Sequence, residues 1–232
     1  MLSKKDAMPP KLKTEIERQQ LRTLIIDAAR ELFVSRGVDA VTMREIAKRI
    51  GYSATSIYLH FADKEALLRA ICDTDFLALA SSLKSILSII HPVERLNALG
   101  RGYAEFALAN PNHYRMMFMT ERTPCDPAES SLQQNNAEQD AYYQLKTVVT
   151  EVHAAGYFRD DLHDTDLIVQ TIWAGMHGVC SLQINMAEDK WVHWSAISAR
   201  LQLMQVVMLR GLLREDNRHQ DIVSEVNMKD AL

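Results

Sequence analysis

Residues 42–61 read TMREIAKRIGYSATSIYLHF and hold two short helical patterns separated by a glycine. Thr42 and Glu45 have the spacing of a capping box, in which each side chain bonds the backbone N–H of the other residue. Gly51 is a typical stop for the first helix, and Ser53 is a typical N-cap for the second. Two short helices joined by such a tight turn predict a helix-turn-helix.

Helical patterns continue on both sides of this motif. Apolar residues recur at steps of three and four over 16–36, which predicts an amphipathic helix that ends at Gly37. A fourth helix is expected to begin after Asp63 and to extend to about residue 90, before His91-Pro92. Further helices are expected near 93–109, 112–120, 137–155, 165–185 and 192–214. The sequence therefore predicts an all-α protein with a three-helix N-terminal head and a larger helical body.

The expected domain limits follow from these patterns. Pro9-Pro10 and four lysines precede the first helical pattern, which predicts a flexible basic arm. We expect this arm over 1–15, the helix-turn-helix head over 16–62, the body over 63–214 and a polar tail over 215–232.

The net charge of the 232-residue chain is −4, but the charge is divided unevenly. Residues 1–60 carry 11 Lys and Arg against seven Asp and Glu, so they hold a net +4 and the remainder holds −8. A basic head on an acidic body indicates that the head meets a polyanion. A chance fluctuation in surface charge remains the alternative reading of this difference.

Composition excludes several classes of protein. The chain is 47% hydrophobic and 24% charged, as in ordinary globular proteins, and we find no unbroken apolar run of membrane-spanning length and no secretory signal. Three cysteines without zinc spacing fit a reducing cytoplasm. A nucleophile elbow, a glycine-rich phosphate loop and an acid/base carboxylate pair are not found in the sequence either. We therefore expect no enzyme activity, no cofactor and no metal site.

The head resembles the DNA-binding head of tetracycline-repressor-like (TetR family) transcription regulators over about 21–70. The resemblance is carried by TMREIA at 42–47, GYS at 51–53, IYLHF at 57–61 and DKEALL at 63–68. It implies phosphate contacts from Thr42, Tyr58, His60 and Lys64, and base-edge contacts from Arg44, Ala54 and Thr55.

The residues support the same reading. Ser53, Ala54 and Thr55 are small, so the start of the third helix can approach the major groove closely. A phosphate bound by Lys64 would offset the cost of a cation at the start of the fourth helix. Tyr52 departs from the family, which more often has a small aliphatic residue there; it either covers the core or contacts DNA.

The body resembles the family less closely. Residues 173–178 read WAGMHG and resemble the Trp-His-Gly pattern of one subgroup's C-terminal domain, and residues 110–118, NPNHYRMMF, resemble a second stretch of it. Trp173 and His177 are one helical turn apart and therefore face the same side. His177 can be a core histidine, a ligand-binding residue or a metal ligand. The metal reading is the weakest, because no second ligand such as a histidine four residues away accompanies it.

We expect a small-molecule site in the body. Methionines and aromatic residues adapt to apolar guests, although they also serve as ordinary core. The candidate lining residues are Tyr103, Phe106, Met117, Tyr142, Trp173, Met176 and His177. The last helix is apolar on most sides, so we expect it to pack both inward and against a second copy of the chain.

These observations favour a ligand-responsive regulator of transcription. We expect a repressor that binds double-stranded DNA as a homodimer at a palindromic operator and responds to a small apolar or aromatic effector, without a membrane partner. Two alternatives remain: an adaptor whose body binds a protein, and an enzyme with an appended DNA-binding head.

Overall fold

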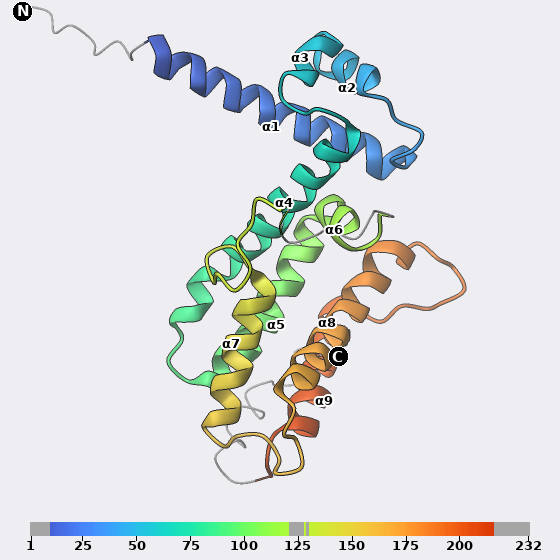
Figure 1. The fold of residues 1–232 in the computed structure, drawn as a ribbon. Coiled ribbons are helices and arrows are strands. Elements are labelled where there is room, and N and C mark those ends of the chain that lie inside the picture. Colours follow the sequence, from blue (N-terminus) through green and yellow to red (C-terminus); the bar gives the residue numbers. More distant parts are fainter. Residues whose placement is uncertain (1–9, 121–127, 129, 216–232) are drawn as a thin grey trace, which may run out of the picture. The chain divides into compact units, whose positions relative to one another are not determined.

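The computed structural model describes residues 10–120, 128 and 130–215, with the side chains of 10–13 not described. This part of the chain is helical, with a single isolated β-bridge between Phe158 and Leu213 (Figure 1). Its elements are α1 (Pro10–Arg36), α2 (Met43–Ile50), α3 (Ala54–Tyr58), α4 (Lys64–Leu83), the 3₁₀ segment η1 (Lys84–Ser88), α5 (Pro92–Ala109), α6 (Pro111–Phe118), α7 (Ala141–Ala154), α8 (Thr165–Met186) and α9 (Ile197–Leu212). The all-α prediction is confirmed.

The chain forms two compact units. The first combines residues 1–75 with residues 112–131, and the second combines 76–111 with 132–232. These limits differ from the expected division at residue 62, because the first turns of α4 and nearly all of α6 belong with the head.

The core of the first unit explains the short helices of the head. Ile46 of α2, Ile57 of α3 and Leu67 of α4 are fully buried in one apolar cluster, together with Met116 of α6. Helices of eight and five residues are too short to be stable alone, so this shared core holds them in place.

The predicted helix ends are confirmed. Thr42 Oγ1 accepts from the N–H of Glu45 at 3.3 Å, and Glu45 Oε2 accepts from the N–H of Thr42 at 2.9 Å, which completes the capping box. Gly51 has φ 75°, a left-handed conformation that favours glycine. Ser53 Oγ accepts from the N–H of Ser56 at 3.2 Å and caps α3.

Other helix limits differ from the prediction. Helix α1 begins at Pro10 instead of residue 16, because proline is well suited to the first helical position. Helix α4 ends at Leu83 and continues only as η1. Helix α9 begins at Ile197 instead of 192, since Trp194 Nε1 donates to Met186 O at 2.9 Å and holds that segment as a loop. The rest of the expected arm, 1–9, and of the tail, 216–232, lies outside the described residues.

The second unit is a bundle in which α8 packs against α5, α7 and α9. A Cβ added to Gly175 would overlap Met208 Sδ, so glycine permits a close approach of α8 and α9 there. Helix α8 is long and apolar enough, by length and composition, to cross a membrane, although polar residues such as Gln170 and His177 interrupt its sequence. One such helix is weak evidence for a span, since core helices pass the same test.

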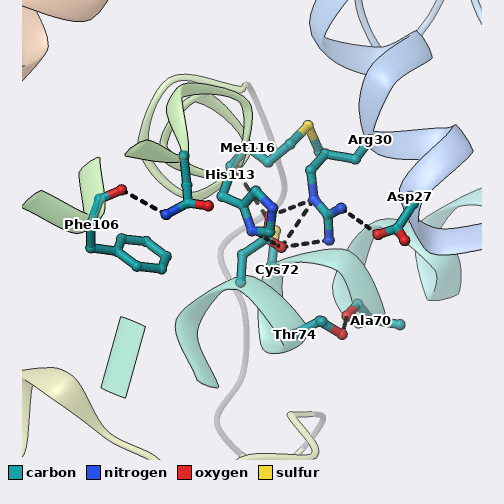
Figure 2. Close-up of polar contacts among 10 residues, drawn as sticks. Asp27, Arg30, Ala70, Cys72, Thr74, Phe106, His113 and Met116 are labelled. Carbon is teal, nitrogen blue, oxygen red and sulfur yellow. Dashed lines mark hydrogen bonds and ion pairs between the residues drawn. The ribbon is translucent and has the colours of Figure 1, made fainter. Parts of the chain in front are cut away.

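A buried ionic network lies inside the first unit (Figure 2). Arg30 of α1 donates Nε to both carboxylate oxygens of Asp75 of α4, at 3.0 and 3.1 Å, and Nη2 to Oδ1 at 2.7 Å. His113 Nδ1 of α6 lies 3.0 Å from Asp75 Oδ1, and Asp27 accepts Arg30 Nη1 at 2.7 Å. The network therefore ties together three helices of this unit.

Candidate functional site

Helix α3 turns its polar side chains away from the core. Ile57 is fully buried and anchors the helix, whereas Thr55 is exposed and Tyr58 is 53% exposed. Ser53 is exposed and Ala54 is half-buried, so the start of α3 presents small side chains at the surface. This arrangement suits entry of α3 into a DNA groove, where close approach of the backbone is required.

The start of α2 holds two of the predicted contacts. The Thr42 hydroxyl donates to Glu45 Oε2 at 2.9 Å, and Arg36 pairs with the other oxygen of Glu45 at 2.9 Å. Hydrogen bonds from Thr42 and the charge of Arg36 lower the pKa of Glu45. Arg44 is exposed and takes part in none of the ion pairs among the described residues. Its guanidinium is thus available for base-edge contact.

The chain after α3 is held by α1. Arg22 Nη1 donates to His60 O at 3.4 Å, and the Arg22 guanidinium lies 4.4 Å from the centroid of the Phe61 ring. Burial, with the positive charges of Arg18 and Arg22, lowers the pKa of His60. The free protein therefore carries a neutral imidazole at this position at pH 7.

Lys64 has contacts that the sequence did not predict. Its Nζ donates to Val38 O at 2.9 Å and to Val41 O at 3.4 Å, so it fastens the loop between α1 and α2. An ammonium has three N–H bonds, which leaves one for a phosphate, and that role stays a prediction. Tyr52 is 48% exposed, so about half of its side chain is accessible, and a DNA contact there stays a prediction.

Four polar and aromatic side chains of the second unit contact one another in sequence: Tyr103, His177, Trp173 and Tyr142. Tyr103 Oη of α5 lies 3.0 Å from His177 Nδ1 of α8, within hydrogen-bond distance. The Trp173 ring packs edge-on to His177 and to Tyr142 of α7, with centroids 6.1 and 5.9 Å apart. The prediction that Trp173 and His177 share one side of α8 is confirmed. Burial lowers the pKa of His177, so its ring is neutral at pH 7.

The other candidate lining residues do not all lie in the second unit. Phe106 and Met176 are buried in the second unit, and Met176 faces α5, near Gly100. Met117 is buried but belongs to the first unit. Within the part of the chain that the structure describes, His, Cys, Asp and Glu side chains form no metal-binding group of three.

The contact of His113 with Asp75 was not predicted from the sequence, because it joins distant parts of the chain. A signal was present in α1, where Arg30 occupies a position on the apolar face, four residues after Ile26. A charged residue in a buried stripe requires a buried partner. The buried carboxylate of Asp75 is that partner.

Comparisons with known proteins agree with this arrangement. Residues 25–71 match the family described as bacterial regulatory proteins, tetR family, and residues 96–191 match the tetracyclin repressor-like C-terminal domain. The HTH-type transcriptional repressor KstR2 of Mycobacterium tuberculosis is 31% identical over 155 residues, which cover 64% of this chain and 74% of that protein.

Solved structures show the same fold. A protein of unknown function from Rhodococcus sp. RHA1 has a TM-score of 0.66 at 25% identity and covers 84% of this chain and 96% of its own. The regulator FadR from Bacillus subtilis, solved in complex with stearoyl-CoA, has a TM-score of 0.66 at 19% identity, with coverage of 82% and 98%.

The family regulates transcription by binding DNA and is not enzymatic, which agrees with the expected absence of catalytic activity. The two family matches lie in the head and in the body, and the match to KstR2 covers 74% of that repressor. This chain belongs to the TetR family of DNA-binding bacterial transcription regulators.

Proposed function

We propose that this chain is a cytoplasmic, ligand-responsive repressor that binds a palindromic operator as a homodimer. The observation that carries the ligand-responsive part is the series of Tyr103, His177, Trp173 and Tyr142 in the second unit. A neutral imidazole bonded to a phenol offers a hydrogen bond of either sense, and the neighbouring rings offer apolar surface. Such sites fix an apolar ligand through a few polar groups.

The effector is a small, largely apolar molecule with at least one polar group. Trp173 is 37% exposed and therefore has surface that a ligand can cover. The complex of FadR with stearoyl-CoA shows an apolar chain with a polar head as a ligand of a protein with this fold. We also assign the second unit to the Trp-His-Gly subgroup, with support from the contact of the Trp173 and His177 rings.

The homodimer is supported by the surface of α8 and α9. Both helices expose large apolar side chains, among them Leu182, Leu203 and Val207, the last two being 56% and 58% exposed. Leu203 and Val207 are one turn apart and form a stripe on α9. Exposed apolar stripes of this kind mark interaction surfaces, and a two-fold dimer would bury the same stripe on both copies.

The test of the effector site uses purified full-length protein and a panel of stearoyl-CoA, stearate and coenzyme A. We expect an apolar member of the panel to raise the melting temperature, since a ligand at 100 times its Kd stabilises a protein by about 2.7 kcal/mol. The same probe should quench Trp173 fluorescence. Trp191→Phe, in an exposed loop, is the control that retains the signal, and Trp173→Phe should lose it.

Tyr103→Phe tests the hydrogen bond to His177 without changing the shape of the site. We expect it to weaken binding of the same probe several-fold while the melting temperature of the free protein changes little. A probe that binds with equal affinity to the wild type, Tyr103→Phe and Trp173→Phe would place the effector site elsewhere. A body that binds a protein partner instead would leave the melting temperature unchanged with every small molecule tested.

A further inference from the structure

The inference concerns the face of α1 that contacts the end of the recognition helix. Arg22 lies on this face, with its guanidinium over the Phe61 ring at 4.4 Å and within 3.4 Å of His60 O. The contact places this face of α1 next to the residues that follow α3 within the same compact unit. A side chain one turn closer to the N-terminus of α1 therefore lies close to the ligand that α3 binds.

Arg18 occupies that position. It precedes Arg22 by four residues, so the two side chains lie on the same face, about 6 Å apart along the helix axis. Arg18 is exposed, and Figure 1 shows the first turns of α1 projecting beyond α2 and α3.

Among the described residues, no carboxylate lies within ion-pair distance of Arg18. Four other arginines of the first unit form ion pairs, namely Arg30 with Asp27 and Asp75, Arg36 with Glu45, Arg49 with Glu31, and Arg69 with Glu65, whereas Arg44 forms none among the described residues. Among the described residues, by contrast, Arg18 and Arg22 take part in no ion pair, although Glu15 and Glu17 are close to Arg18 in sequence. Burial and, after it, the positive charges of Arg18 and Arg22 lower the pKa of His60, so both arginines lie close enough to act on this imidazole.

We propose that Arg18 binds a phosphate of the DNA backbone next to the base pairs read by α3, so that α1 adds a sequence-independent contact to the operator complex. The occupant is DNA because Arg18 is exposed, forms no ion pair among the described residues and lies one turn from the contact of Arg22 with the residues after α3, and because arginine forms strong charged hydrogen bonds to phosphate oxygens. The inference rests on the proposed placement of α3 on the operator. It adds a DNA contact outside the helix-turn-helix residues predicted from the sequence.

The test compares Arg18→Gln with Arg49→Gln in the full-length protein. Both substitutions remove one positive charge from the same unit, but Arg49 is paired with Glu31 at 3.1 Å. The operator is first obtained by selection of bound DNA followed by sequencing. Binding to this operator and to a scrambled duplex is then titrated at 50 and 200 mM salt. We expect Arg18→Gln to weaken both complexes by the same factor and to lower the salt slope by about 0.9 for each bound head. The loss of DNA affinity in Arg18→Gln, relative to the wild type, should therefore shrink roughly 3.5-fold per head between 50 and 200 mM salt. Arg49→Gln should keep the wild-type salt slope.

The outcomes separate this inference from the proposed function. If Arg18→Gln keeps the wild-type salt slope of DNA binding, the phosphate contact of Arg18 is overturned. If Arg44→Ala at the same time loses its preference for the operator, α3 still stands as the helix that reads the bases. An equal loss of slope in Arg49→Gln would also overturn it, because net charge alone would then explain the effect. Unchanged operator affinity in Arg44→Ala and Thr55→Ala would instead reject the placement of α3 on DNA.

Discussion

Arg30 and Asp75 form a bidentate ion pair inside the first unit, with Asp75 fully buried and Arg30 nearly so. Removing one partner of a buried pair leaves an uncompensated charge, which typically costs about 3–5 kcal/mol. We therefore expect Asp75→Asn to lower the free energy of unfolding of the first unit by about this amount. Urea denaturation measures the loss.

The control for this prediction is Asp27→Asn. Asp27 also pairs with Arg30, at 2.7 Å, but its side chain is 57% exposed. An exposed pair contributes about 0–1 kcal/mol, so the control should unfold almost as the wild type does. Equal stability of both variants would show that Arg30 finds another partner or that water reaches it.

The pH dependence of DNA binding should reveal proton uptake by the His60 imidazole. Burial and the charges of Arg18 and Arg22 lower its pKa below the ordinary value of 6.5, so the free protein loses stability as pH falls through this range. A bound phosphate favours the imidazolium form and raises the pKa, and DNA binding then takes up a proton. Affinity should rise as pH is lowered from 7.5 to 6, by about tenfold at most for each unit of pKa gained on binding.

His60→Gln should abolish this component of the pH dependence. The measurement is the ratio of operator affinities at pH 6 and pH 7.5, compared with the ratio for the wild type. His193→Gln, in the loop between α8 and α9, should retain the wild-type ratio. A retained ratio in His60→Gln would show that another group takes up the proton.

Residues that read bases should behave differently from residues that position the head. Arg44→Ala and Thr55→Ala should each cost about 1–3 kcal/mol of operator affinity and relax the preference for sequence. Tyr58→Phe should weaken binding to operator and scrambled DNA alike, because a phosphate contact carries no sequence information. Competition titrations with both duplexes distinguish these patterns.

Lys64→Ala should combine two effects. It removes the hydrogen bonds to Val38 O and Val41 O, so the melting temperature should fall. If the third N–H binds phosphate, the salt slope should also fall by about 0.9 for each bound head. A lower melting temperature with the wild-type slope would restrict Lys64 to bracing the loop between α1 and α2.

Ligand and operator should influence each other equally. If a probe such as stearoyl-CoA weakens operator binding by a factor of about 5–150, operator DNA must weaken binding of that probe by the same factor. Probe affinity is measured in the free and operator-bound wild type and in Trp173→Ala. Equal probe affinities in the two states of the wild type would exclude an allosteric switch.

The dimer prediction concerns α9. Leu203→Glu with Val207→Glu should yield a monomer in sedimentation experiments, because paired carboxylates cannot be buried at a two-fold interface. Ile90→Glu is a matched control, since Ile90 is 94% exposed. Selection of bound DNA should return an inverted repeat whose half-site centres lie about 34–36 Å apart, whereas an asymmetric half-site bound by a monomer would contradict the prediction.

The sequence predicted the head well because its signals are local. The caps at Thr42 and Ser53 and the left-handed Gly51 each depend on a few adjacent residues, and all three are present. It could not predict the bond of Tyr103 to His177 or the contact of His113 with Asp75, because those pairs meet only through tertiary packing. The early start of α1 was missed because a proline pair fits either a mobile arm or a first helical turn.

The inclusion of residues 112–131 in the first unit has a consequence for engineering. Met116 completes the apolar core beneath the helix-turn-helix, and His113 lies against the buried Asp75. Yet these residues fall within the span, 96–191, that sequence comparison assigns to the C-terminal domain. A chimaera that exchanges heads between relatives at a single junction would therefore mismatch part of its own core. A successful graft has to transfer two separate segments of the gene.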